Sequence, residues 1–459
     1  MLNSNNIIAT FAHKIGMDGA IAYSSAARIF QAFAGVISIF FIATFLTGEE
    51  QGYYFTFNSI LAAQIFFELG FTGIMTQYVA HEVAHLNLNE SYVYEGEERY
   101  KSRLAYLVRF CLKWYVVVAI LFFAIIVVVG FVYFCRFASS EDNINWQAPW
   151  ILLSFSTAIK LFQSPFTAIY TGLGKVKEMN RIAFYQQLII PISQWVLFAC
   201  GLKLYVIGIG SLLAVLVWWV FVLQSGLWRI LFNLLKEKVT ESISYMKEIF
   251  PYQWKIALSW VSGYFIYQLF NPVLFATEGA VIAGQMGMTV QVLNTIQGFA
   301  FSWQNTKIPR YCGLIEMKLY TELDSVFNKT LKQMVVVCTT ILLMFYAVIF
   351  VLRATSFSIG DTVLADRFLP LIPMALMTIP VVVNQFVSSW ATYLRCHKQE
   401  PFLINSVVIG ILCCISTLVL GKYYGLYGIT IGYSSLVLFV SLPWGYLIYM
   451  NKRKEWHGQ

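Results

Sequence analysis

Long apolar segments separated by charged residues run through the whole sequence and constrain what the chain can fold into. A helix that crosses the hydrocarbon core of a bilayer needs about 20 predominantly apolar residues. Runs of this kind predict transmembrane helices at approximately 19–46, 52–80, 104–134, 148–172, 183–201, 205–233, 252–276, 280–306, 331–352, 368–394, 402–420 and 425–449. The expected fold class is therefore an all-α integral membrane protein with twelve transmembrane helices, since helices pair their own backbone groups in lipid.

The composition excludes a water-soluble enzyme. Of the 459 residues, 59% are hydrophobic and only 12% are charged, whereas soluble domains are about 25% charged. The eight cysteines have no CxxC pair and no regular spacing, so neither a disulfide framework nor a zinc module is indicated. No phosphate-binding loop or dinucleotide fingerprint is present, and we expect no cofactor and no nucleic-acid partner.

Lysine and arginine are distributed unevenly over the connections between these helices. If both termini are cytoplasmic, the inner connections hold about four times as many of them as the outer ones. This bias predicts a multi-pass protein with both termini inside, and the net charge of +8 then reflects cytoplasmic anchoring. The first apolar run is too long for a cleaved signal peptide and is expected to remain in the protein.

The two halves of the sequence resemble each other in layout. The long connections 81–103 and 308–330 stand at equivalent places and have equal lengths. We therefore predict two six-helix lobes, 1–234 and 252–459, joined by a basic cytoplasmic linker at 235–251. Six is an even number, so both lobes share one orientation and are related by a pseudo-two-fold axis along the membrane normal. Such a pair usually holds its substrate path between the lobes.

Charged residues lie where lipid is expected. Arg28, Glu68 and Lys160 are each near the middle of a predicted helix, where a charge costs about 2.5–3.5 kcal/mol on insertion scales. They predict a hydrated, mostly cationic vestibule that attracts an anionic head group. The alternative is that Arg28 and Glu68 only pair with each other. Three further basic residues lie nearer the inner surface and either line the same vestibule or extend to the interface: Arg109, Lys113 and Lys255.

Amide side chains are frequent in the second half of the chain. Gln291, Asn294 and Gln297 recur every three residues in the helix predicted at 280–306, and together they cover one broad face. That face could line a path for sugars. It could equally form hydrogen bonds between helices, which contribute about 1 kcal/mol each in model systems.

Residues 81–85, with the sequence HEVAH, match the zinc-protease pattern H-E-x-x-H. On a helix, His81 and His85 would share a face with Glu82 as general base. A catalytic zinc needs a third protein ligand, and the nearby acids belong to a charged loop. A membrane metalloprotease is therefore a remote alternative, and no metal site is predicted.

Five short segments, together with the two six-helix halves, carry a resemblance to known transporters. They are LTGEEQGY at 46–53, ELG at 68–70, IPR at 308–310, YLRCHKQEP at 393–401 and GLYG at 425–428. With these segments the chain resembles the Wzx-like polysaccharide and O-antigen flippases, the polysaccharide transport family of the multidrug/oligosaccharidyl-lipid/polysaccharide (MOP) exporter superfamily.

The resemblance implies that the protein moves undecaprenyl-diphosphate-linked oligosaccharide repeat units from the cytoplasmic to the outer leaflet. It implies alternating access coupled to a gradient of protons or another cation, in a bacterial cytoplasmic membrane, alongside a glycan polymerase and glycosyltransferases. Arg28, Lys160 and Lys255 would be similar to cavity cations that meet the diphosphate or acidic sugars. Ion coupling would fall to Glu68, because the helices predicted at 252–276 and from 368 onward contain no acidic residue.

Two other functions remain open. A multidrug or small-molecule exporter could share this fold, although the basic residues argue against organic cations as substrates. A lipid-dependent glycosyltransferase or glycan polymerase would need acids or arginines on substantial outer loops, and the predicted outer loops are short. The sequence thus favours a secondary transporter over an enzyme.

Overall fold

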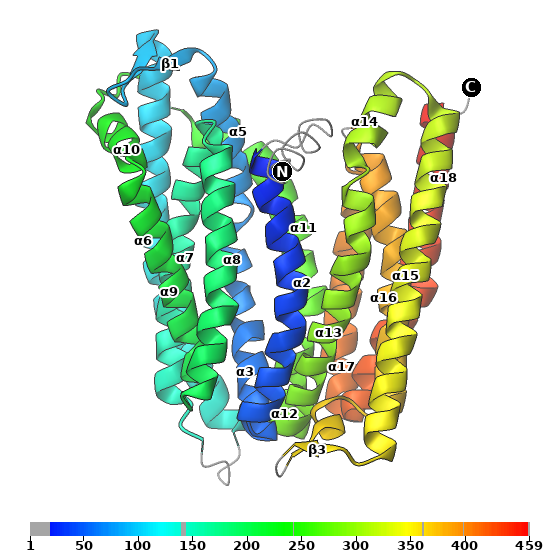
Figure 1. The fold of residues 1–459 in the computed structure, drawn as a ribbon. Helices are drawn as coiled ribbons and strands as arrows, with labels where there is room; N and C mark the ends of the chain where they lie inside the picture. Colours follow the sequence, from blue (N-terminus) through cyan, green and yellow to red (C-terminus); the bar gives the residue numbers. More distant parts are fainter. Residues whose placement is uncertain (1–18, 139–143, 242, 360–361, 398, 458–459) are drawn as a thin grey trace, which may run out of the picture. The chain divides into compact units, whose positions relative to one another are not determined.

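The computed structural model describes residues 19–138, 144–241, 243–359, 362–397 and 399–457, and they are nearly all helical (Figure 1). Each of the twelve predicted ranges coincides with helix, so the predicted all-α membrane fold is confirmed. Among the described residues, seven helical segments are long and apolar enough to cross a membrane.

The chain forms two compact units, each assembled from separated segments. Unit 1 contains residues 1–34, 64–132 and 145–257, and unit 2 contains 35–63, 133–144 and 258–459. Three helices continue from one unit into the other along the chain: α2 (Gly19–Phe45), α6 (Glu98–Phe137) and α11 (Phe250–Tyr267).

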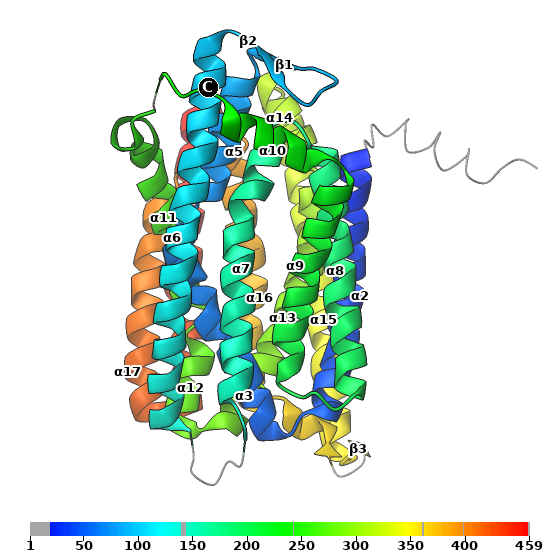
Figure 2. The same ribbon diagram turned by 90° about the vertical axis from the view of Figure 1, so that its left-hand side faces the viewer.

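The remaining elements of unit 1 form a helical bundle with one small hairpin. They are α4 (Ile65–Glu68), α5 (Phe71–Val83), β1 (Leu86–Leu88), β2 (Tyr94–Gly96), α7 (Gln147–Gly172), α8 (Val176–Ala199), α9 (Tyr205–Gln224), α10 (Leu227–Lys236) and the π-helical turn η2 (Tyr245–Ile249). The amphipathic α10 turns away from the direction of α9 (Figure 2), because Gly226 adopts a left-handed conformation with φ 72°.

The remaining elements of unit 2 are also mostly long helices. They are α3 (Gly48–Leu61), α12 (Phe270–Glu278), α13 (Ala280–Asn305), α14 (Ile308–Glu316), α15 (Tyr320–Ala354), β3 (Ser358–Ile359), β4 (Thr362–Val363), η3 (Leu364–Arg367), α16 (Leu371–Arg395), α17 (Leu403–Leu436), η4 (Val437–Ser441) and α18 (Leu442–His457). The short turn η1 (Ala62–Gln64) follows α3 and leads into α4.

The units do not follow the predicted lobes throughout. Residues 35–63 and 133–144 belong to the first predicted lobe but group with the C-terminal helices. The lobes 1–234 and 252–459, and the symmetry between them, therefore stay a prediction.

The helical run α17 reverses direction inside its own limits. Gly425 has non-helical dihedrals, φ 54° and ψ −134°. A Cβ atom on Gly428 would lie 2.2 Å from the carbonyl oxygen of Leu420, and one on Gly432 would lie 2.4 Å from the hydroxyl of Ser416. Residues before and after Gly425 thus pack antiparallel, as the two helices predicted at 402–420 and 425–449 require.

Glycine allows α3 and α13 to pack backbone against backbone in unit 2. A Cβ atom on Gly52 would lie 2.0 Å from the carbonyl oxygen of Ala280. Beside it, the Gln51 side-chain amide donates to the carbonyl oxygens of Gly284 (2.8 Å) and Arg367 (3.0 Å). Close approach of small residues is the usual way for helices to associate inside a membrane.

This contact makes Gly52→Ala a destabilising substitution. The added methyl group must separate two backbones, and overpacking of this kind costs about 1–3 kcal/mol. Gly298→Ala is the matched control, because a Cβ atom on that α13 glycine meets nothing within 4 Å. Thermal unfolding of both purified variants, followed by size-exclusion chromatography, should show a lower midpoint only for Gly52→Ala. Equal midpoints would contradict the packing described here.

Candidate substrate cavity

The second predicted helix, at 52–80, is interrupted in the middle. Between α3 and α5 the chain passes through η1 and α4 and then through two left-handed residues, Leu69 (φ 48°) and Gly70 (φ 68°). Irregular backbone at membrane depth is tolerated where protein or a water-filled cavity surrounds it. Such an interruption is therefore typical of a helix that borders a cavity.

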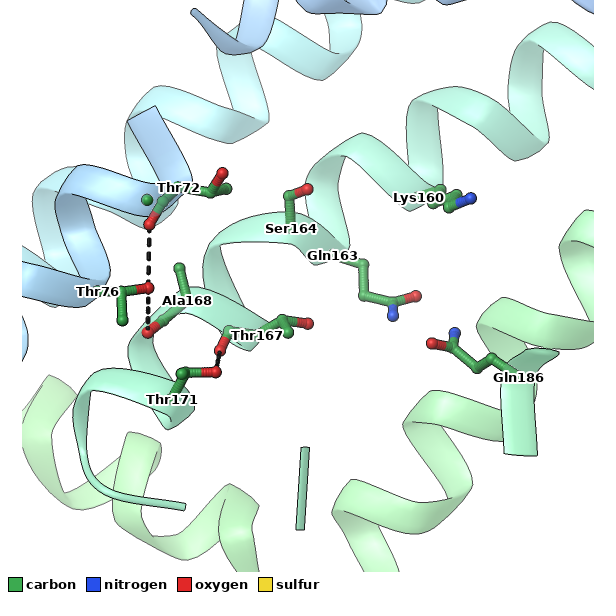
Figure 3. Close-up of a pocket in the computed structure, with 10 residues that line it drawn as sticks. Thr72, Thr76, Lys160, Gln163, Ser164, Thr167, Ala168, Thr171 and Gln186 are labelled. Carbon is green, nitrogen blue, oxygen red and sulfur yellow. Dashed lines mark hydrogen bonds between the residues drawn. The ribbon is translucent and has the colours of Figure 1, made fainter. Parts of the chain in front are cut away.

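A cavity of about 400 Å³ lies beside this interruption, within unit 1. It is bordered by α5, α7 and α8 (Figure 3). Its lining is rich in hydroxyl and amide groups and includes Thr72, Gly73, Thr76, Lys160, Gln163, Ser164, Thr167, Ala168, Thr171 and Gln186. A polar cavity among apolar helices is typical of a transported substrate's path rather than of lipid contact.

One predicted charged residue lines this cavity, and a second is hydrogen-bonded to its lining. Lys160, near the middle of α7, lines it and is accessible to solvent. Glu68, at the end of α4, accepts a hydrogen bond of 2.5 Å from the hydroxyl of Thr72, which also lines the cavity. The charges of Glu68 and Lys160 attract each other. The cavity can therefore offer a cation to an anionic ligand, and the Glu68 carboxylate is linked to its lining through the hydroxyl of Thr72.

Gln163 and the hydroxyl residues of this cavity were not among the predicted site residues. A signal for them exists in the sequence: the polar residues 160, 164, 167 and 171 recur at helical spacing along the otherwise apolar α7. Positions separated by four, seven and eleven residues share one face of a helix. A polar stripe of this kind on a transmembrane helix predicts a hydrated surface.

The other predicted cations lie elsewhere. Arg28 is on α2, but its side chain lies outside the described residues. The guanidinium of Arg109 donates to the carbonyl oxygens of Leu235 (2.7 Å) and Glu237 (2.5 Å), at the C-terminal end of α10. Lys113 on α6 and Lys255 on α11 are exposed. Of the predicted cations with a described side chain, only Lys160 lines this cavity.

The three predicted amides lie on α13 in unit 2 and are not among the residues that line this cavity. Gln291 and Gln297 are half-buried and Asn294 is exposed. Their assignment to a sugar path stays a prediction.

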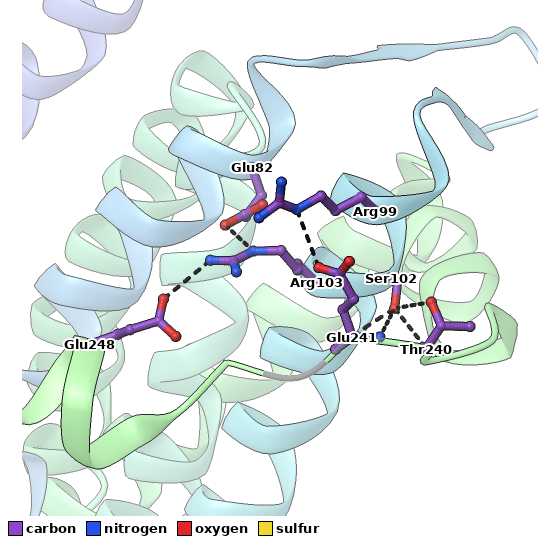
Figure 4. A network of polar contacts seen from close by, with 7 residues as sticks. All are labelled: Glu82, Arg99, Ser102, Arg103, Thr240, Glu241 and Glu248. Carbon is purple, nitrogen blue, oxygen red and sulfur yellow. Dashed lines mark hydrogen bonds and ion pairs between the residues drawn. The ribbon is translucent and has the colours of Figure 1, made fainter.

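The HEVAH segment is part of a structural ion-pair network. Glu82 is buried, and its carboxylate accepts a hydrogen bond of 2.9 Å from Arg103 of α6, which also reaches Glu248 at 3.2 Å (Figure 4). His81 and His85 are exposed. In the described part of the chain no group of three potential metal ligands comes together. The motif is accounted for by packing of α5 against α6.

The same network attaches the predicted linker to unit 1. The hydroxyl of Ser102 accepts hydrogen bonds from the backbone N–H groups of Thr240 (2.7 Å) and Glu241 (2.9 Å) (Figure 4). The hydroxyl of Tyr78 donates to the carbonyl oxygen of Glu248. With the Arg109 contacts, these bonds hold Leu235, Glu237, Thr240, Glu241 and Glu248 against α5 and α6.

The solved structures that this chain resembles in fold include a lipid flippase and multidrug transporters. The chain matches the inward closed conformation of the lipid II flippase MurJ with a TM-score of 0.63 and 16% sequence identity, covering 94% of this chain and 87% of that one. It matches the inward-facing conformation of a multidrug resistance MATE family transporter of the MOP superfamily with a TM-score of 0.57 and 14% identity, covering 92% and 99%. The outward-facing conformation of such a transporter gives 0.54 and 12%, covering 94% and 96%.

The chain has the fold of the MOP transporters. The predicted superfamily layout is thus confirmed at the level of fold. At these identities the likeness carries no assignment of substrate, and comparison of the sequence with models of known protein families and with curated proteins gives no match.

Proposed function

We propose that the protein flips undecaprenyl-diphosphate-linked oligosaccharide repeat units from the cytoplasmic to the outer leaflet of a bacterial inner membrane. It does so by alternating access, with both termini cytoplasmic, and it serves the synthesis of a cell-surface polysaccharide such as O-antigen or capsule. The observation that carries this proposal is Lys160, a cation in a hydroxyl-lined cavity among apolar helices. A lysine in such a place attracts phosphate or carboxylate.

Glu68 is the proposed coupling residue. Its carboxylate attracts Lys160, so neutralising it with a proton would change how strongly Lys160 holds an anion. The resemblance to MurJ, a flippase of lipid II, supports a lipid-linked substrate. The resemblance to multidrug transporters supports small-solute export as the alternative, but a lysine in the cavity repels the cations that many such exporters carry.

The test is the sidedness of the lipid-linked glycan in cells. Cells that lack the protein should accumulate undecaprenyl-linked repeats in the inner leaflet, and the wild-type gene should clear them. Accessibility of the glycan to an impermeant probe, in intact cells and in inverted vesicles, measures the distribution. If loss of the protein leaves sidedness unchanged, the flippase proposal is wrong and small-solute export becomes the leading function.

A further inference from the structure

Helix α10 is held on unit 1 by one buried face and by hydrogen bonds from three neighbouring elements. The buried face consists of aliphatic residues at the spacing i, i+3, i+4 and i+7: Leu227, Ile230, Leu231 and Leu234. The hydroxyl of Tyr170 on α7 donates to the carbonyl oxygen of Leu227 at 3.2 Å. Asn233 donates to the carbonyl oxygen of Tyr92, in the turn between β1 and β2, at 2.9 Å. With the contacts from Arg109 of α6, these bonds fix which side of α10 faces away from the protein.

The outward side of α10 carries two large aromatic residues. Trp228 and Phe232 are 41% and 49% exposed, and their ring centroids are 6.2 Å apart. Because they are four residues apart, they form one strip along the helix.

This aromatic strip follows an exposed apolar face of α9. Leu216, Val220 and Leu223 are exposed at helical spacing on a helix long and apolar enough to cross a membrane. An apolar face of this kind on a membrane-spanning helix contacts lipid. The chain turns at Gly226, directly after this face (Figure 2). The strip therefore continues a lipid-contact surface at the level where α9 ends, and tryptophan is enriched at that level of a membrane.

Two cations lie beside the aromatic strip. The guanidinium carbon of Arg229 is 5.8 Å from the ring centroid of Trp228 and 5.9 Å from that of Tyr92. The Nζ atom of Lys236 is 4.0 Å from the ring centroid of Phe232. Within the described part of the chain neither cation forms an ion pair with a carboxylate. The aromatic rings hold both charges next to the strip, where an external anion can reach them.

The combination of aromatic strip and cations restricts the ligand. A soluble anion would neutralise Arg229 and Lys236 but would leave Trp228 and Phe232 in water. A neutral lipid would cover the aromatic rings but would leave the cations without a counter-charge. An anionic lipid satisfies both, as it does for interfacial helices that combine tryptophan or phenylalanine with basic residues.

We propose that α10 binds anionic phospholipid of the cytoplasmic leaflet. Trp228 and Phe232 lie at the boundary between head groups and acyl chains, and Arg229 and Lys236 contact the phosphate groups. This inference goes beyond the proposed function, because the ligand is a component of the membrane and not the transported substrate. No residue of α10 lines the cavity that contains Lys160, so the two sites can be tested separately.

The experiment measures binding of phosphatidylglycerol and phosphatidylcholine to the purified full-length protein by native mass spectrometry. The wild type should bind phosphatidylglycerol more tightly than phosphatidylcholine. Arg229→Gln/Lys236→Gln should weaken binding of phosphatidylglycerol about 25-fold, because each basic residue near an anionic surface contributes a factor of about five. Binding of phosphatidylcholine should stay unchanged. Trp228→Ser/Phe232→Ser should weaken binding of both lipids, because it removes the apolar contact that they share.

Lys329→Gln/Lys332→Gln is the matched control. It removes the same charge from two exposed positions of another helix, α15, and should bind phosphatidylglycerol like the wild type. The single variants Arg229→Gln and Lys236→Gln, each with an expected loss of about fivefold, serve if the double variant does not fold. If the control loses as much binding as Arg229→Gln/Lys236→Gln, or if the wild type binds both lipids equally, the inference is wrong.

Discussion

Replacing Lys160 with glutamate should abolish clearance of lipid-linked glycan from the inner leaflet, with the transport rate at least about 100-fold lower. A charge-assisted hydrogen bond contributes about 1.5–3 kcal/mol, and the substitution removes this attraction and adds repulsion. Glu68 would then lie near a second carboxylate instead of a cation. Transport measured by leaflet sidedness in complemented cells is the readout, after membrane expression has been matched between variants.

Two control substitutions distinguish the effect of the charge in the cavity from the effect of a charge change elsewhere on the protein. Lys160→Arg keeps the cation and should retain most transport. Lys177→Glu changes the charge of an exposed residue in the first turn of α8, outside the cavity lining, and should leave transport close to wild type. Should Lys160→Glu transport normally, the cavity in unit 1 is not on the substrate path, and the proposed site has to be abandoned.

The fold could be predicted from the sequence because lipid permits so few backbone arrangements. The twelve ranges predicted from apolar length all fall on helix, and the depth of its charge singled out Lys160, which lines the cavity. The interruption of the second helix was not predicted, since Leu69 is an ordinary helix former and only its left-handed conformation (φ 48°) breaks the run. Glycine at position 70, next to it, was the only local signal.

The site was only partly predicted because several of its residues contact residues that are far away in the sequence. Arg109 was predicted either to line the vestibule or to extend to the interface, and its guanidinium donates to a carbonyl oxygen 126 residues away in sequence. Gln163 carries no signal of its own, because a membrane-embedded amide more often bonds a neighbouring helix. Its place in the cavity lining follows only from the packed structure. The role of Glu82 in the HEVAH segment also depends on a partner elsewhere in the chain, since Arg103 lies on another helix.

Replacing Arg103 with methionine should lower the free energy of unfolding by about 3–5 kcal/mol, because it leaves a buried carboxylate without its counter-charge. The Glu82 side chain is 3% exposed, whereas that of Arg103 is 20% exposed. Arg103 also holds Glu248 and thereby one end of the linker. Unfolding in denaturant, followed by intrinsic fluorescence of the purified protein, measures the change.

A second arginine on α6, Arg99, tests whether the loss of stability depends on burial of the ion pair. Arg99 also pairs with a linker residue, Glu241, at 3.3 Å, but both side chains are exposed, at 62% and 46%, and exposed pairs contribute little. Arg99→Met should therefore scarcely change stability. The double variant Glu82→Leu/Arg103→Met should recover much of the loss seen in Arg103→Met, because it removes the stranded charge together with its partner. If the double variant is as unstable as the sum of its single changes, the two residues do not interact, and Arg103 acts through its contacts with the linker alone.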